Sequence, residues 1–129
     1  MFKGFKNKFI KTKKGKIFCR FGGKGPPLLL LHGYPQTHLM WHKTAPKLSE
    51  NFTVIVADLR GYGSSFAPNG DVKHINYSKR EMAKDMVQMM NKLGHKKFFL
   101  AGHDRGGRVA HRMARDHRSK IIAMSVLDI

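Results

Sequence analysis

Short apolar runs alternate with segments of helical periodicity from Leu28 to Leu127, and this alternation constrains the fold most. The apolar runs cover residues 28–31, 52–57, 98–101 and 121–127, and the helical patterns cover residues 38–50, 78–93 and 106–117. The runs lack polar–apolar alternation, as expected of strands that are buried on both faces. Strands that alternate with helices in this order predict an α/β fold with a parallel sheet and helices on both of its faces.

Two further strands are expected before this region, at residues 5–13 and 16–21, joined by a tight turn. Ser78 and Glu81 have the spacing of a capping box, which starts a helix, and Gly94 is placed to end it. The methionines of this helix recur on one face, which indicates a core-facing stripe rather than a ligand site.

The charge balance is strongly basic, with 25 Lys and Arg against 8 Asp and Glu, a net charge of +17. The basic residues are spread over the chain instead of gathered in one arm, which favours a solvated surface over a nucleic-acid interface. Cys19 is the single cysteine, so no internal disulfide can form. With no secretory signal and no apolar run long enough to cross a bilayer, we expect a cytoplasmic protein without a membrane partner.

Residues 102–106, Gly-His-Asp-Arg-Gly, follow an apolar run and precede a helical pattern, which is the setting of a nucleophile elbow. The two glycines permit a sharp strand-to-helix turn. Asp104 then projects beside a helix N-terminus, where free N–H groups favour an anion. An ionised carboxylate suits displacement at a saturated carbon, whereas a serine suits acyl transfer. The alternative for Asp104 is an ordinary helix N-cap.

Arg105 and Arg108 are three residues apart, so both can lie on one face near the start of the same helix. Two guanidinium groups there could hold a substrate carboxylate against Asp104, and two solvated surface arginines are the alternative. The backbone N–H groups of Tyr34, just after the strand at 28–31, and of Arg105 are placed to stabilise developing negative charge.

Asp58 and Asp128 both follow predicted strands and compete as the acid that orients a histidine. For Asp58 we expect a structural ion pair or turn with Arg60, whereas Asp128 ends the strand next to the elbow strand and is better placed for catalysis. His32 is expected to make structural hydrogen bonds and not to act as a base. The remaining histidines lack metal-ligand spacing, so we expect no metal.

Together these motifs resemble those of the α/β-hydrolase superfamily and, within it, the haloacetate (fluoroacetate) dehalogenases. The resemblance extends from the N-terminal hairpin to Asp128 and rests on the segments 32–42, 58–63, 102–106 and 126–129. Arg105 is the discriminating residue. Haloalkane dehalogenases and epoxide hydrolases usually carry tryptophan after the nucleophilic aspartate, and the haloacid-type enzymes carry arginine.

The resemblance implies that residues 1–129 are the N-terminal portion of a single α/β-hydrolase core domain, an antiparallel hairpin followed by parallel strands that alternate with helices. Full members of the family continue through a helical cap to the catalytic histidine. No histidine of this chain stands where that base is expected, so we expect the 129 residues to lack turnover.

The resemblance also implies a two-step dehalogenation of 2-haloacids through an aspartyl ester. Asp104 is then the nucleophile, Arg105 and Arg108 bind the substrate carboxylate, the backbone N–H groups of Tyr34 and Arg105 form the oxyanion hole, and Asp128 is the triad acid. The expected partner is a small anionic haloacid, with no cofactor, and the resemblance is compatible with a homodimer of the complete protein. An epoxide hydrolase and a basic remnant that binds polyanions are the alternatives.

Overall fold

The computed structural model describes residues 2–129, which form six strands and three α-helices. In chain order, with two short 3-10 helices written η, these are β1 (Lys6–Lys11), β2 (Lys16–Gly23), β3 (Pro27–Leu31), η1 (His38–Trp41), α1 (Thr44–Leu48), β4 (Thr53–Ala57), α2 (Lys79–Lys92), β5 (Phe98–His103), α3 (Arg105–Asp116), η2 (Arg118–Lys120) and β6 (Ile121–Leu127). Of the helices in residues 2–129, none is long and apolar enough to cross a bilayer.

The strands form one mixed sheet in the order β1-β2-β4-β3-β5-β6. The hairpin of β1 and β2 is antiparallel, and β2 also pairs with β4 in antiparallel fashion. The strands β4, β3, β5 and β6 are parallel to one another. The predicted α/β class, with an antiparallel hairpin followed by parallel strands, is therefore confirmed.

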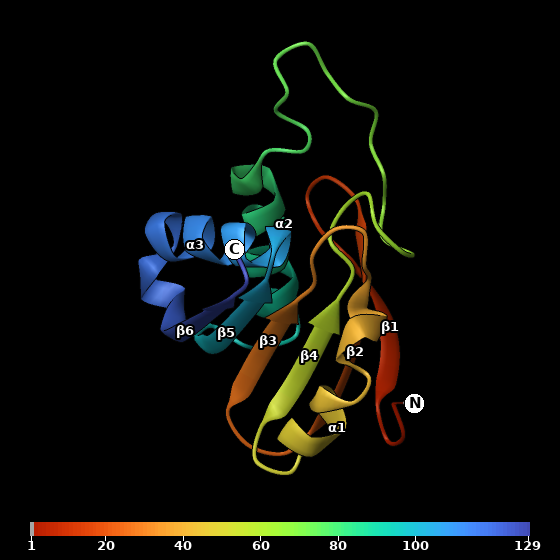
Figure 1. The fold of residues 1–129 in the computed structure, drawn as a ribbon, viewed down its shortest axis with the longest axis vertical. Coiled ribbons are helices and arrows are strands. Elements are labelled where there is room, and N and C mark those ends of the chain that lie inside the picture. Colours follow the sequence, from red (N-terminus) through yellow and green to blue (C-terminus); the bar gives the residue numbers. More distant parts are fainter. Residues whose placement is uncertain (1) are drawn as a thin grey trace.

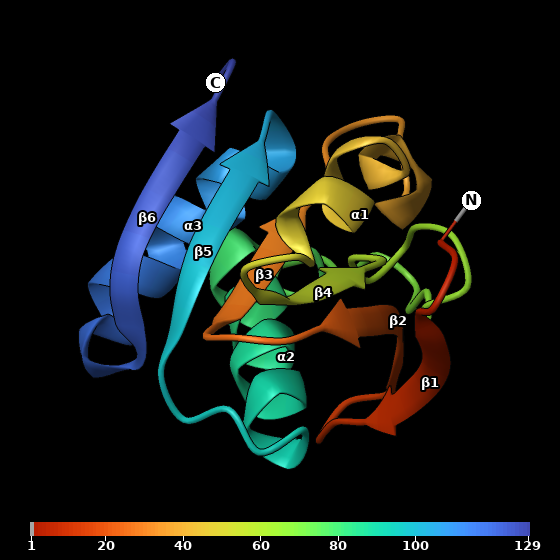
Figure 2. The same cartoon turned by 90° about the horizontal axis from the view of Figure 1, so that it is seen from below.

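Helices cover both faces of the sheet, and the side chains of the central strands alternate between them. Leu29 and Leu31 of β3 join the cluster that contains the methionines of α2 and the apolar residues of α3. Leu28 and Leu30 face the other way and join Trp41 and the first turn of α1. Figure 2 shows α2 and α3 on one side of the sheet and α1 on the other. Burial on both faces explains why β3 is apolar at each leucine position.

The carboxyl ends of the four parallel strands place polar residues along one edge of the sheet. His32 follows β3, Asp58 follows β4, Asp104 follows β5 and Asp128 follows β6. In Figure 1 the segment between β4 and α2 rises above this edge. Ligands of open α/β sheets bind at such an edge, so this edge is where a functional site is expected.

One prediction about the sheet is wrong: β6 is present with the expected bounds, but it is not buried. Six of its seven residues are exposed, among them Ile122, Met124 and Val126, whose exposed fractions are 51%, 37% and 40%. The strand pairs with β5 through one edge only and is the last strand of the sheet. An apolar run predicts a strand, but burial depends on neighbours that a run of residues does not reveal.

Candidate active site

The sharp turn expected at Asp104 is present, because β5 ends at His103 and α3 begins at Arg105. Asp104 lies alone between the two elements with φ of 54° and ψ of −119°, a backbone conformation that side-chain-bearing residues rarely adopt. Asp104 occupies the N-cap position of α3, but its side chain makes no capping hydrogen bond, so it differs from an ordinary N-cap residue. A strained residue at the carboxyl edge of a parallel sheet is a feature of functional sites.

The turn is possible only because two glycines remove side chains where backbones meet. A Cβ on Gly102 would lie 2.3 Å from the carbonyl oxygen of Gly106. A Cβ on Gly106 would lie 2.4 Å from the carbonyl oxygen of His32. Backbone atoms cannot yield as side-chain ends can, so these glycines let α3 pack directly against β5 and β3.

The Asp104 carboxylate points toward the loop after β3. The backbone N–H of Tyr34 donates a hydrogen bond to Oδ2 of Asp104 over 3.0 Å. This bond first, then the backbone N–H of Arg105 and the charge of Arg108, lower the pKa of Asp104 below its usual value of 3.8. The group is therefore an ionised carboxylate at neutral pH, and the backbone N–H of Tyr34 donates to it.

We expect Gly33→Ala to disturb this arrangement strongly. A Cβ on Gly33 would lie 2.5 Å from Cβ of Asp104 and 2.8 Å from its Oδ2, so the carboxylate must move away from the Tyr34 N–H. A displacement of this size at a reacting group is expected to slow alkylation of Asp104 by a haloacid by about 10- to 100-fold. Peptide mapping of the ester over time measures the rate.

Gly70→Ala is the matched control for this substitution. A Cβ on Gly70 meets no atom within 4 Å, and its φ is not positive. The control should react like the unmodified chain. An alkylation rate for Gly33→Ala that equals the control rate would contradict the close approach of Gly33 to Asp104.

The guanidinium of Arg105 lies between two tyrosines that sequence reasoning did not connect. Its Nη1 donates a hydrogen bond to the Tyr62 hydroxyl over 3.2 Å, and its Cζ lies 4.7 Å from the centroid of the Tyr34 ring. Tyr62 is in the Asp-Leu-Arg-Gly-Tyr-Gly segment after β4, at the same edge of the sheet. That shared edge is the signal that could have linked Tyr62 to the site.

Two other cations lie near Asp104. Arg108 is exposed on the first turn of α3, and its charge contributes to the lowered pKa of Asp104. Lys79, the first residue of α2, was not predicted as part of the site. Burial first, then the charges of Arg105 and Arg108, lower the pKa of Lys79, and Asp104 opposes that shift. The edge of the sheet around Asp104 is therefore strongly cationic, which favours an anionic ligand.

Among residues 2–129, no hydrogen bond joins the side chain of Asp128 to that of Asp104. The Asp128 side chain is 91% exposed, and its Oδ2 lies 3.8 Å from Nε2 of His103. His103 is the last residue of β5 and directly precedes Asp104. Its Nδ1 is buried without a hydrogen-bond partner in residues 2–129. The structure therefore places Asp128 at the carboxyl end of β6, beside the turn, and its role as triad acid stays a prediction.

The other histidines near the sheet edge have structural roles. His32 is fully buried, with Nδ1 3.0 Å from the carbonyl of Gly33, and its Nε2 accepts a hydrogen bond from the backbone N–H of Leu59. Burial lowers its pKa, so it is neutral, as expected of a structural histidine. His38 is buried too, and no three potential metal ligands come together within residues 2–129.

Of the ion pair or turn predicted for Asp58 and Arg60, the ion pair is wrong. A turn does run through Arg60, closed by a hydrogen bond from the Tyr62 N–H to the carbonyl of Leu59 over 3.0 Å. Asp58 is buried and accepts hydrogen bonds from the backbone N–H and Nδ1 of His38, both over 2.8 Å. Arg60 turns to α2 instead and pairs with Asp85 over 2.6 Å. Nearness in sequence suggested the first pairing, whereas the helix that covers the strand supplies the second. The sequence does carry one indication of the pair with Arg60, because the Asp85 carboxylate lies among the buried apolar residues of α2.

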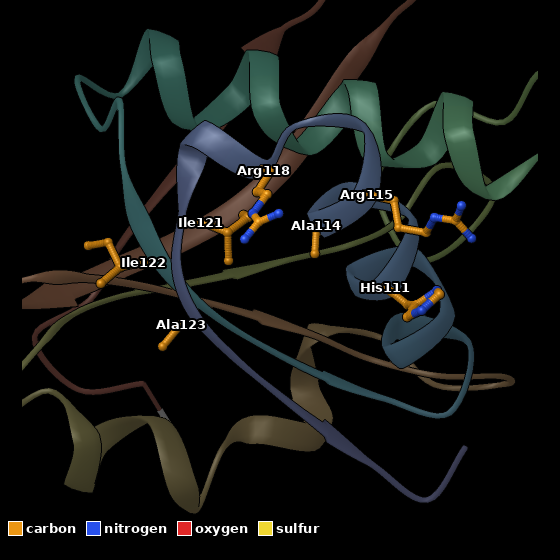
Figure 3. Close-up of a pocket in the computed structure, with 7 residues that line it drawn as sticks. All are labelled: His111, Ala114, Arg115, Arg118, Ile121, Ile122 and Ala123. Atoms are coloured by element: carbon orange, nitrogen blue, oxygen red, sulfur yellow. The ribbon is translucent and has the colours of Figure 1, made fainter.

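A hollow of about 520 Å³ lies elsewhere on the molecule, between the second half of α3 and the start of β6. Figure 3 shows its lining residues, which are His111, Ala114, Arg115, Arg118, Ile121, Ile122 and Ala123. The parallel strands begin at this end of the sheet, and Asp104 follows the opposite end of β5. The hollow is therefore separate from the candidate site.

Comparison with known proteins is consistent with this geometry. A family model described as the alpha/beta hydrolase fold matches residues 26–129. The chain belongs to the α/β-hydrolase family. This hydrolase-family chain is 50% identical over 129 residues to a fluoroacetate dehalogenase of Burkholderia sp, and the match covers 100% of the chain and 42% of that protein. It is 42% identical over 107 residues to a soluble epoxide hydrolase of Corynebacterium sp. (strain C12), and that match covers 83% of this chain and 36% of the hydrolase.

A solved structure gives the same result for the fold. ALR0039 from Nostoc sp PCC 7120, described as an α/β hydrolase, superposes with a TM-score of 0.99 and 54% identity, over 100% of this chain and 44% of that one. The chain thus spans about two fifths of the length of the relatives it matches.

Proposed function

We propose that this α/β-hydrolase chain carries the nucleophile and the anion-binding side of a site that dehalogenates 2-haloacids. The observation that carries the proposal is the Asp104 carboxylate, held by the Tyr34 N–H at 3.0 Å with the Arg105 guanidinium over the same Tyr34 ring. A carboxylate nucleophile and a cation therefore converge on one small region of the sheet edge.

In the first step the free oxygen of Asp104 attacks the carbon that bears the halogen. A C–O bond forms, the C–halogen bond breaks, and the halide leaves with the bonding electron pair. The product is an ester between Asp104 and the remaining acid, and no proton is transferred. The lowered pKa of Asp104 supports this role, because only the ionised carboxylate attacks.

In the second step water attacks the carbonyl carbon of that ester, and a base takes the water proton. The carbonyl oxygen then carries the negative charge, and the Tyr34 N–H that now contacts Oδ2 is placed to stabilise it. Collapse then breaks the bond between the carbonyl carbon and the substrate oxygen, and that oxygen takes a proton from the protonated base, so the 2-hydroxy acid is released. The new carboxylic acid loses its proton, which restores the Asp104 carboxylate. The resemblance assigns the role of this base to none of the histidines in residues 2–129, so we expect the ester to persist in this chain.

The substrate class is proposed from the charges around Asp104. The guanidinium of Arg105 and the charges of Arg108 and Lys79 favour a ligand with its own carboxylate. The second candidate is an epoxide hydrolase, because the Corynebacterium relative carries that name. An epoxide is neutral and gains less from these cations, so the haloacid is the better match.

The test is to incubate the chain with bromoacetate and, separately, with the neutral epoxide styrene oxide. Peptide mapping then locates the adducts. Hydroxylamine cleaves an aspartyl ester but not a thioether or an alkylated histidine. We expect a hydroxylamine-sensitive adduct on Asp104 with bromoacetate and none with styrene oxide. An epoxide adduct on Asp104 that forms faster than the haloacid ester would support the second candidate. The absence of both adducts from a chain that circular dichroism shows to be folded would contradict the proposal.

A further inference from the structure

We propose that Tyr62 and the ring of Tyr34 hold the Arg105 guanidinium beside Asp104 and thereby set the preference of the site for anionic substrates. The inference rests on the proposed function, which assigns Asp104 and Arg105 but gives no role to either tyrosine side chain. Both tyrosines are positioning residues in this scheme, since neither is required to touch the reacting atoms.

Tyr62 is itself held by the core. Its ring packs edge-to-face on the ring of His32, with centroids 5.0 Å apart and an interplanar angle of 69°. His32 is fixed in turn by its contacts with the carbonyl of Gly33 and the N–H of Leu59. The hydroxyl that receives the hydrogen bond from Arg105 is therefore attached to a buried support.

Tyr34 couples the guanidinium to the nucleophile. Its backbone N–H donates to Oδ2 of Asp104, and its ring lies under the Cζ of Arg105. The same residue therefore contacts both the attacking carboxylate and the cation. A 2-haloacid carries its carboxylate on the halogen-bearing carbon, so it can present that carbon to Asp104 and its carboxylate to Arg105.

The contacts leave Arg105 able to bind a ligand. Only Nη1 is engaged with Tyr62, and a guanidinium has several further N–H donors in a planar fork. Arg105 is otherwise an exposed, flexible side chain that would sample many rotamers. Holding it in one place before the substrate arrives reduces the entropy lost on binding.

Tyr62→Phe and Tyr34→Leu test the proposal, with Tyr77→Phe as the matched control. Tyr62→Phe removes the hydroxyl and keeps the ring on His32. Tyr34→Leu removes the ring and keeps the backbone N–H. The hydroxyl of Tyr77 donates to the carbonyl of Pro68, in the segment before α2, and touches neither Arg105 nor Asp104. Each chain is treated with anionic bromoacetate and with neutral bromoacetamide, and the Asp104 ester is quantified over time.

We expect Tyr34→Leu to raise the bromoacetate concentration that gives half the maximal rate of ester formation by about two- to five-fold, the size of a cation–π contact at an exposed site. Tyr62→Phe removes one hydrogen bond, and we expect a rise of about two- to ten-fold. The bromoacetamide rate at Asp104 should stay unchanged in Tyr62→Phe and should fall less than the bromoacetate rate in Tyr34→Leu, and both rates should stay unchanged in Tyr77→Phe. Equal slowing with both reagents would show a merely structural role. No change with either reagent would also overturn the proposal.

A second measurement does not depend on the proposed reaction. Phenylglyoxal modifies arginine after loss of a guanidinium proton, which a hydrogen bond and an aromatic face both oppose. We expect Arg105 to react more slowly than Arg108 in the unmodified chain, and to react faster in each of the two variants than in the unmodified chain. Equal rates in the unmodified chain would overturn the positioning role. If the chain forms no Asp104 ester while Arg105 is protected in this way, the proposed function fails and the positioning of Arg105 stands.

Discussion

We expect Asp104→Asn to carry no haloacid-derived ester, with a rate at position 104 at least about 1,000-fold below that of the unmodified chain. The amide of asparagine is neutral and a very weak nucleophile, whereas the lowered pKa of Asp104 keeps its carboxylate ionised. The asparagine side-chain oxygen can still accept the hydrogen bond from the Tyr34 N–H. The substitution therefore removes the nucleophile and leaves the surrounding contacts in place. Intact mass and peptide mapping after treatment with bromoacetate measure the effect.

The backbone should tolerate this change, because asparagine accepts a positive φ as readily as aspartate does. Asp116→Asn is the matched control, since it makes the same substitution at the far end of α3. The control should form the ester at the normal rate. Cys19 does not compete strongly for the reagent, because burial raises the pKa of its thiol to about 12. An ester of equal yield elsewhere in Asp104→Asn would contradict the assignment of the nucleophile.

Local signals predicted most of the fold. Ser78 was expected to start a helix, and its side chain accepts a hydrogen bond from the Glu81 N–H over 3.2 Å at the start of α2. Gly94, expected to end that helix, has a φ of 93° that glycine adopts without strain. Caps, turns and periodicity depend on residues close together in the chain, so they can be read without a structure.

Part of the site was also predictable, because strand order and direction place distant residues at one edge. Tyr34 and Asp104 are 70 residues apart in sequence, yet the hydrogen bond between them joins the ends of adjacent strands β3 and β5. The rule that parallel strands present their carboxyl ends together was sufficient to expect them to be neighbours.

The predictions that failed concern contacts between side chains of different helices and strands. The exposure of β6 depends on what lies beside it, and the contact between Tyr62 and Arg105 depends on the path of the segment after β4. Periodicity gives the face on which a residue lies but not its partner on another element. The partner of Arg60 was missed for this reason.

The buried ion pair of Arg60 with Asp85 carries the largest effect on stability that we expect from one substitution. We expect Arg60→Met to lower the free energy of unfolding by about 3–5 kcal/mol. Arg60 donates to Asp85 from Nε over 2.6 Å and from Nη2 over 2.7 Å, and both side chains are 2% exposed. Nη1 donates to the carbonyl of Asn76 over 2.7 Å, and the ring of Phe66 lies 4.8 Å from Cζ. Methionine satisfies none of these acceptors and leaves the Asp85 carboxylate buried without its cation.

The loss should depend on pH in a direction set by Asp85. Burial raises the pKa of Asp85 above its usual 3.8, and the hydrogen bond from Arg60 opposes that shift. Without Arg60 the pKa rises further, so the folded chain binds a proton that the unfolded chain has lost. Stability of Arg60→Met therefore increases as pH falls toward 3.8, and the difference from the unmodified chain narrows. Urea unfolding at pH 8 and at progressively lower pH measures both effects.

Arg80→Met is the matched control, because it removes the same residue type from an ion pair at the surface. Arg80 pairs with Asp116 over 2.9 Å, and its side chain is 59% exposed. Solvent screens that pair, so we expect a loss of less than about 1 kcal/mol. The double variant Arg60→Met with Asp85→Leu should recover much of the stability, since no unpaired carboxylate then remains. A single-variant loss no greater than that of Arg80→Met would show that the buried pair does not stabilise the attachment of α2 to the segment that carries Tyr62.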